Sequence, residues 1–310
     1  MEKSRLAAET RHAEAKRMAE AVQRLEEKQR GDSARLAEES RRAEMARLAE
    51  ESRRAEVSRQ NLVNLPPWQT TIVEGKVSFG GFLGLGKKTE HYRIECEAQT
   101  FNVDGVLFYM VRIPNRPYSM SQTQVTQALY RAVMGKNPSN FKGDDLPVET
   151  VSWEEGIAFC NALSTKLGLT PAYRGTNNNC QLIEGATGFR LPFEAEWELA
   201  AKGGQNFKYA GSDNLDAVGW YNGNSGDKTH SVGQLKANGY GLHDMSGNVW
   251  EWCADDYSNP GQHRPGASER AYRGGSWLNS AGFCEVSYRG NYSPGNRYNL
   301  LGLRLSRSLD

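Results

Sequence analysis

Five cysteines are the side chains with the widest chemical repertoire in this sequence, because a thiolate can serve as a nucleophile, a redox centre or a metal ligand. They are Cys96, Cys160, Cys180, Cys253 and Cys284. Their number is odd, their spacing is wide, and no two form a Cys-X-X-Cys motif. This pattern argues against a metal knuckle and against a disulfide framework, and it indicates reduced thiols of the kind kept in a cytosol.

A second candidate is the glycine-rich stretch GFLGLGKK, from Gly81 to Lys88, which nearly matches a phosphate-binding loop. Lys88 stands where such a loop carries a Ser or Thr to hold Mg²⁺. No helix signal follows it either. We therefore interpret this stretch as the turn of a β-hairpin rather than as a nucleotide site.

The segment from Arg273 to Asp310 offers chemistry of another kind, that of a contact surface. Between Leu278 and Leu300 it follows neither the period typical of a strand nor that typical of a helix. Its tyrosines provide rigid, amphipathic contact area, and its asparagines and serines provide adaptable hydrogen bonding, a mixture that binding surfaces use. The same composition also fits a surface loop without a role. Within the segment, the residues that look fixed for backbone reasons are Gly274, Gly275, Pro294 and Gly302.

Length and charge limit the classes of function. The chain has 310 residues and a formal net charge of +1, so it carries no global basic field that would attract nucleic acid or an anionic membrane. No run approaches the roughly 18 to 20 apolar residues of a membrane span, and no apolar secretory signal opens the sequence. We therefore expect no nucleic-acid partner, no membrane span and a cytoplasmic location.

Residues 1–63 differ in kind from the rest, since they hold no Phe, Trp, Tyr or Pro and a single Gly, Gly31. ARLAEESRRAEM at 34–45 recurs as ARLAEESRRAEV at 46–57. The composition predicts two helices, about 3–30 and 33–60. A 12-residue repeat turns by about 120° per copy, so Leu36 and Leu48 do not share a face and no sustained heptad seam forms. The segment is expected to pack on a partner or another copy, or to stand as a solvated stalk.

The remaining chain mixes short strands, a few helices and long loops, which predicts an α+β fold. Residues 68–113 alternate like strands, and residues 124–135 predict a helix closed by Gly135. Ser152 and Glu155 form a capping box for a further helix, which ends at Gly168. Cys160 falls on the apolar face of that helix, so we expect a core thiol.

Several motifs in order carry a resemblance to a known family. They are NPSNFKGDDLPVETVSW, GFRLPFEAEWELAAKGG, NGYGLHDMSGNVWEW, RGGSW and LGLRL. Together they resemble the formylglycine-generating enzymes, also called sulfatase-modifying factors, over about residues 100–310. The resemblance implies an α+β domain of the C-type-lectin-like (formylglycine-generating-enzyme-type) fold, here preceded by the N-terminal α-helical segment.

The same resemblance implies an activity that this chain departs from. The family oxidises a substrate cysteine with two cysteines that bind copper, placed shortly after the GGS(Y/W) motif. The first of these positions is Asn279 here and the second is Cys284. A two-thiolate copper site cannot form from Cys284 alone, and Asn279 supplies no nucleophile. We therefore predict no catalytic residues, and we expect Cys284 to pack in the core.

A narrower resemblance concerns the tail, because RGGSW…C…R…P…R…LGLRL is similar to the variable proteins of diversity-generating retroelements. In those proteins a reverse transcriptase randomises adenines in Asn-rich codons. The resemblance implies fixed residues at Ala281, Cys284, Arg289, Pro294, Arg297, Leu301 and Gly302. It implies that the ligand-binding residues are Leu278, Asn279, Ser280, Gly282, Phe283, Glu285, Tyr288, Gly290, Asn291, Tyr292, Ser293, Tyr298, Asn299 and Leu300.

The family also binds calcium around its GNxWEW motif. The matching groups here are Asp244, the carbonyls of Gly247 and Val249, and Glu251, which are hard oxygen ligands suited to Ca²⁺. A hydrogen-bonded turn in which Glu251 caps backbone amides fits the same residues. The resemblance thus implies no required cofactor and one candidate structural Ca²⁺ site. Trp250 and Trp252 are expected in the core.

We divide the chain into an α-helical segment at 1–63, a β-rich connecting region at 64–100 and the family domain at 101–310, with a variable region at 273–310. The predicted function is recognition of a protein ligand through a hypervariable surface, without catalysis. The helical segment would bind itself or a partner protein. The alternatives are a formylglycine-generating-type oxidase and a structural or adhesin tip protein with a helical stalk.

Overall fold

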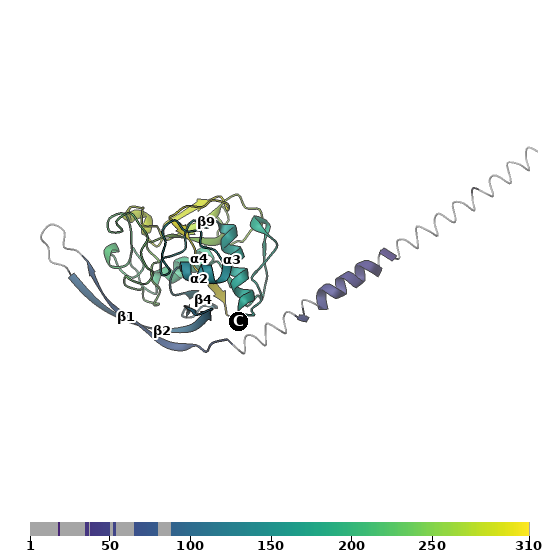
Figure 1. Ribbon diagram of the computed structural model, residues 1–310, viewed down its shortest axis with the longest axis horizontal. Coiled ribbons are helices and arrows are strands. Elements are labelled where there is room, and N and C mark those ends of the chain that lie inside the picture. The colour runs from purple at the N-terminus through teal and green to yellow at the C-terminus, as the bar shows by residue number, and fades with distance from the viewer. Residues whose placement is uncertain are drawn as a thin grey trace, which may run out of the picture. The chain divides into compact units, whose positions relative to one another are not determined.

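The computed structural model describes residue 18, residues 35, 36, 38–49, 52 and 53, and residues 65–79 and 88–309 (Figure 1). The chain forms two compact units, Met1–Val57 and Ser58–Asp310. Among the described residues, no helix has the length and apolar character that crossing a membrane requires.

In the first unit, every described residue is helical and exposed. Leu36, Met45 and Leu48 are 58%, 66% and 46% exposed, so within this unit they bury little apolar area. Arg42 donates to Glu38 across one helical turn at 2.6 Å, a pair that adds a few tenths of a kcal/mol to a helix. The predicted helix at 33–60 is helical wherever it is described. The predicted break at Gly31 lies outside the described residues.

A six-stranded sheet runs through the second unit, in the order β1-β2-β3-β4-β12-β7. Its strands are β1 (Gln69–Phe79), β2 (Lys88–Val103), β3 (Val106–Arg112), β4 (Tyr118–Ser121), β7 (Phe189–Arg190) and β12 (Ser306–Ser308). All of their pairings are antiparallel. The strand β12, which follows residues 278–300 in sequence, therefore lies inside this sheet between β4 and β7.

The strands β1 and β2 pair along 11 residues as a long curved hairpin (Figure 1). Their side chains alternate as the sequence predicted. On β1, Val73 and Val77 are buried while Ile72, Glu74 and Lys76 face solvent. Phe79 opposes Lys88 in the register, so β1 and β2 pair as the two strands of a hairpin. The turn predicted at the phosphate-loop-like segment from Gly81 falls on residues 80–87, which lie outside the described part.

Three helices follow: α2 (Gln127–Met134), α3 (Trp153–Lys166) and α4 (Glu194–Lys202). The predicted capping box of α3 is present, with Ser152 and Glu155 exchanging hydrogen bonds. The start predicted for α2 is wrong by three residues. Thr126 accepts from the Leu129 amide and caps the helix, so Gln124 and Val125 lie before the helix begins.

The second sheet carries the tail. Its order is β10-β9-β8-β11, and its strands are β8 (Trp250–Asp256), β9 (Arg270–Arg273), β10 (Arg289–Tyr292) and β11 (Leu301–Gly302). A small two-stranded sheet pairs β5 (Tyr173–Arg174) with β6 (Gln181–Leu182). Short 3-10 turns are η1 (Asn177–Asn179), η2 (Leu215–Ala217) and η3 (Ala281–Cys284). The α+β prediction is thereby confirmed.

The core lies between these elements and confirms several sequence expectations. Cys160, Trp252 and Cys284 are 0% exposed, and Trp250 is 3% exposed. Cys160 and both tryptophans belong to the largest hydrophobic cluster, which joins α2 and α3 to both sheets. Four of the five cysteines are buried, and Cys96 is half-buried. The thiols therefore act as small packing groups.

Candidate binding surface and oxygen cage

The predicted ligand-binding residues lie on a segment that is held at many backbone positions. Residues 278–300 connect β9 to β11 through η3 and β10. The Trp277 indole donates to the Asn299 carbonyl at 2.9 Å. The amide of Thr150 donates to the Tyr298 carbonyl, and that of Trp153 to the Pro294 carbonyl, each at 3.0 Å. The backbone under the surface is thus fixed from the scaffold side.

Thirteen of the fourteen predicted contact residues are exposed or half-buried, and we call them together the tail surface. Leu278 is 48% exposed, Phe283 39%, Tyr288 37% and Tyr298 40%. These are large apolar groups that a folded chain usually hides. Gly290 is the exception. It is buried, and a Cβ there would overlap the ring of Tyr272, so it supports the surface from below.

A cluster of aromatic rings in T-shaped and tilted contact supports the tail surface. The rings of Trp250 and Tyr272 lie 4.7 Å apart, those of Tyr272 and Tyr292 also 4.7 Å, and those of Tyr292 and Tyr298 4.8 Å. Tyr288 lies 5.8 Å from Trp250. Contacts of this geometry add about 0.5–1.5 kcal/mol each beyond burial. The exposed rings are therefore held in place before any ligand arrives.

Residues predicted to be fixed form the connections to the scaffold. Arg289 makes a two-pronged ion pair with Glu194, at 2.7 and 2.6 Å. Arg297 pairs with Glu155 at 2.8 Å. The Ser246 hydroxyl donates to the carbonyl of buried Cys284 at 2.8 Å. Arg289 and the Cys284 carbonyl thus attach the segment to the scaffold from below, and Arg297 attaches it through a pair at the surface.

The predicted copper positions do not form a thiolate pair. Asn279 is half-buried, and its side chain meets the Ser276 hydroxyl. Burial raises the pKa of the Cys284 thiol to about 12, so almost none of it is thiolate at neutral pH. In the part of the chain that the structure describes, no group of three or more His, Cys, Asp or Glu side chains could hold a metal.

The predicted calcium groups do come together, around a side chain that the sequence analysis missed. The backbone carbonyls of Asp244, Gly247 and Val249 and the Oε1 of Glu251 all face the amide nitrogen of Gln124. We call these four oxygens the oxygen cage. Three of them are main-chain atoms. Gln124 lies 120 residues before Asp244, and no local pattern marks it.

Every hydrogen-bond partner of the Glu251 carboxylate in the described part of the chain is a side chain, so the alternative weighed for it, the capping of backbone amides, is wrong. Its carboxylate is fully buried and pairs with Arg304, whose Nε lies 2.8 Å from Oε2 and Nη2 2.8 Å from Oε1. The Trp197 indole donates to Oε2 at 2.6 Å. Arg304 thus neutralises the one carboxylate in the cage, and its role was also missed from sequence.

The Asp244 carboxylate takes a different position from its carbonyl. Its Oδ2 accepts from the Gly233 amide at 2.8 Å. Its Oδ1 is buried without a hydrogen-bond partner among the described residues, as is the Oε1 of Gln124. Burial raises the pKa of this carboxyl. An unsatisfied buried oxygen costs about 1–3 kcal/mol, and a cation is one group that could relieve two of them.

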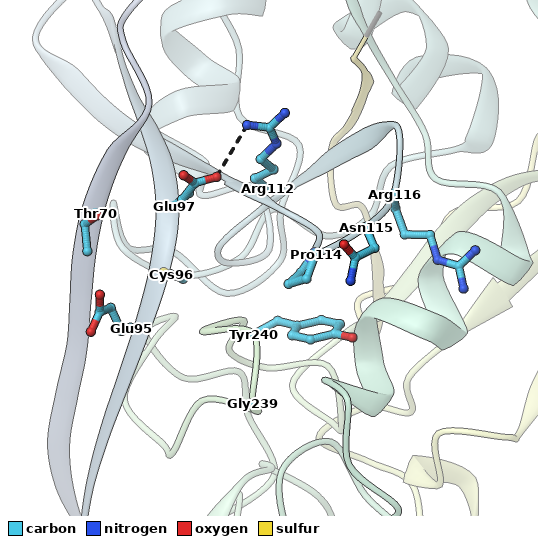
Figure 2. Close-up of a pocket in the computed structure, with 10 residues that line it drawn as sticks. All are labelled: Thr70, Glu95, Cys96, Glu97, Arg112, Pro114, Asn115, Arg116, Gly239 and Tyr240. Carbon is cyan, nitrogen blue, oxygen red and sulfur yellow. Dashed lines mark hydrogen bonds and ion pairs between the residues drawn. The ribbon is translucent and has the colours of Figure 1, made fainter.

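A cavity of about 760 Å³ lies away from both features (Figure 2). Glu95 and Arg116 stand at opposite sides of it, with the Tyr240 ring between them. Arg112 lies 3.4 Å from Glu97. The charged residues are all exposed, so the cavity presents no desolvated polar group that would select a ligand. We assign it no function.

Comparisons with known proteins give one family and several similar proteins. The family described as "Sulfatase-modifying factor enzyme 1-like domain" matches residues 67–309. The chain is 40% identical to the "Chaperone protein LppX" of Paenibacillus barcinonensis, over 62% of this chain and 80% of that protein. It is 34% identical to the "Formylglycine-generating enzyme" of Streptomyces coelicolor, over 80% of each. The solved structure of "Treponema denticola variable protein 1" superposes with a TM-score of 0.62 and 37% identity, covering 68% of this chain and 99% of that one.

Proposed function

This chain belongs to the sulfatase-modifying factor enzyme 1-like family, and we propose that within the family it is a recognition protein. In this proposal it binds a protein ligand through the tail surface and has no oxidase activity. The observation that carries the proposal is the exposure of four large apolar side chains on one anchored segment. Exposed apolar groups gathered in this way commonly mark interaction sites.

The chemistry of the tail supports a non-catalytic role. A copper oxidase of the kind that the resemblance implies needs two thiolates, and Asn279 stands in place of the first. The second, Cys284, is buried with a thiol pKa raised to about 12. A thiol with that pKa is a poor soft-metal ligand at neutral pH. Copper binding with consumption of a thiol substrate would be the result that contradicts this.

The aromatic content supports a protein ligand. Tyr288 and Tyr298 have few torsions to freeze, and they lie on rings that are already packed. Rigid aromatic anchors of this kind dominate the energy of protein–protein contacts. The helical unit would link recognition to another copy of the chain or to a partner protein, since the leucines and methionines that are described in it are exposed.

We expect the double substitution of Tyr288 and Tyr298 by alanine to weaken ligand binding by at least about thirtyfold, the loss of a single hot spot. Tyr109→Ala is the matched control, because Tyr109 is also 37% exposed but lies on β3. A protein cross-linked to the wild type in a native lysate should be lost with the double variant and kept with the control. Titration with this protein in purified form then gives the dissociation constants of the wild type and of the double variant. Equal binding by both variants would overturn the proposal.

The pattern of anchors and exposed residues also supports diversification by a retroelement. We expect the DNA near this gene to hold a near-copy of the codons for residues 273–310, differing at adenines, beside a reverse-transcriptase gene. The differing codons should fall on tail-surface residues and spare Arg289 and Cys284, whose side chains face the scaffold. Sequencing a few kilobases on each side of the gene checks this. Differences spread over the anchors would contradict it.

We further propose that the oxygen cage holds a structural calcium ion. Carbonyl and carboxylate oxygens are the ligands that Ca²⁺ prefers, in sets of about six to eight. The residues fit the ion, because four oxygens converge and two further buried oxygens nearby lack partners. Arg304 offsets the charge of Glu251, which leaves Asp244 as the carboxylate without a cationic neighbour in a hydrogen bond. The bound ion would fix the loop that leads into β8.

A further inference from the structure

The buried side chain of Gln124 faces more hydrogen-bond acceptors than its amide group can serve. Its amide nitrogen lies 3.2 Å from the Asp244 carbonyl and 3.3 Å from that of Gly247. It also lies 2.8 Å from the Val249 carbonyl and 3.0 Å from the Oε1 of Glu251. An amide nitrogen carries two hydrogens, so it cannot satisfy four acceptors at once.

The oxygen of the same amide, by contrast, lacks a hydrogen-bond donor in the described part of the chain. The Oε1 of Gln124 is buried and has no hydrogen-bond partner in the described part of the chain, and the same holds for the Oδ1 of Asp244. Gln124 is 1% exposed and Asp244 is 3% exposed, so bulk water does not serve these atoms. The region therefore has an excess of oxygen acceptors and too few positive groups.

A half-turn of the amide exchanges its oxygen and nitrogen while every other heavy atom stays in place. With the nitrogen inward, the amide is a weak substitute for a cation among the four oxygens. With the oxygen inward, a fifth acceptor would face the cage, and only a cation could hold that arrangement together. The two orientations thus match a cation-free and a cation-bound state.

We propose that Gln124 is a calcium ligand of this protein and closes the site in the absence of the ion. Its amide oxygen coordinates the bound ion together with the oxygen cage, and its amide nitrogen fills the cage when the ion leaves. This inference rests on the calcium site proposed above and adds to it a residue from the chain before α2. It also ties the loop at 244–251 to the segment that leads into α2.

The test uses Ca²⁺ titration of the full chain after chelator treatment, followed by thermal unfolding and by terbium luminescence. The Trp197 indole nitrogen lies 2.6 Å from Glu251, so this tryptophan is placed to sensitise Tb³⁺ bound in the cage. Gln124→Leu removes the amide at nearly constant volume and should weaken Ca²⁺ and Tb³⁺ binding at least about tenfold. Gln124→Glu should tighten Ca²⁺ binding by about the same factor, since affinity follows ligand charge.

Gln127→Leu is the matched control. Gln127 is also a fully buried glutamine, but it binds the carbonyls of Phe141 and Pro147 instead of the cage. This variant is expected to lose stability and to keep the wild-type calcium affinity. Gln124→Glu should also unfold at a lower temperature than wild type in chelator, because its carboxylate cannot donate to the cage, and should recover with Ca²⁺.

The outcomes separate the two proposals. Wild-type protein that binds no Ca²⁺ up to about 1 mM, the weak end of protein calcium sites, overturns the site and the role of Gln124 together. Wild-type binding that Gln124→Leu leaves unchanged overturns the role of Gln124 alone. If Gln124→Leu does not fold, Gln124→Glu decides, since an affinity equal to wild type and unchanged stability in chelator would overturn the inference.

Discussion

Replacing Arg304 by methionine is expected to destabilise the second unit by about 3–5 kcal/mol, the cost of leaving a buried charge without its partner. Arg304 and Glu251 are both fully buried and share two hydrogen bonds. Arg304 also donates to the carbonyl of Ser121 at 2.8 Å and to that of His243 at 2.6 Å. Methionine fills much of the space but satisfies none of these oxygens. Urea unfolding of wild type and variant measures the difference.

Arg93→Met is the control for this prediction, because Arg93 pairs with Glu74 at 3.0 Å while both side chains remain more than half exposed. Exposed pairs contribute about 0–1 kcal/mol, so this change should have little effect. Adding Glu251→Gln to Arg304→Met should restore part of the lost stability, since it removes the unpaired charge. Similar losses for Arg304→Met and Arg93→Met would contradict the argument.

The second large effect is expected at Gly275, where alanine should cost stability through two separate causes. The backbone there has a φ of +79°, a conformation that costs a residue with a Cβ about 1–2 kcal/mol. The new Cβ would also overlap the Sγ of Cys284 and lie 2.9 Å from its Cα. Crowding in a packed core adds about 1–3 kcal/mol. Urea unfolding measures the sum.

The control for Gly275→Ala is Gly105→Ala, since Gly105 has a φ of +89° and open space around the new Cβ. It should show the backbone cost alone. Because Cys284 ends η3, crowding at Gly275 should also displace Phe283 and weaken ligand binding, while Gly105→Ala should leave binding unchanged. A Gly275→Ala variant as stable as Gly105→Ala would contradict the crowding argument, because it would show that η3 moves away at no cost.

Local sequence signals predicted the parts of this fold that depend on neighbours in the chain. Ser152 and Glu155 marked the start of α3 because a capping box needs nothing beyond four residues. The alternation on β1 and β2 followed from one buried face. The start of α2 was misplaced because Thr126 was included in the helix, although its side chain caps it. Gln124, two residues earlier, binds oxygens more than 100 residues away.

In the candidate site, too, the features that depend on local sequence could be predicted and those that depend on distant partners could not. The exposure of most tail-surface residues could be predicted from the sequence, since a segment without periodicity and with aromatic and amide side chains is unsuited to a core. The burial of Gly290 could not be predicted, because it depends on Tyr272 from the neighbouring strand. Gln124 and Arg304 were missed for a physical reason. A buried polar network is defined by partners from distant parts of the chain, and each member alone resembles an ordinary surface residue.

The position of β12 has a consequence for any copying process that rewrites the tail. Arg304, β11 and β12 all follow the tail surface in the sequence, and β12 occupies an interior place in the six-stranded sheet. A substitution in residues 278–300 leaves them intact, whereas an insertion or deletion of one nucleotide replaces all three. Frame-shifted products would then lack both an interior strand and the partner of Glu251 and would not fold. Only products copied in frame would then fold, and only these would present a tail surface to a ligand.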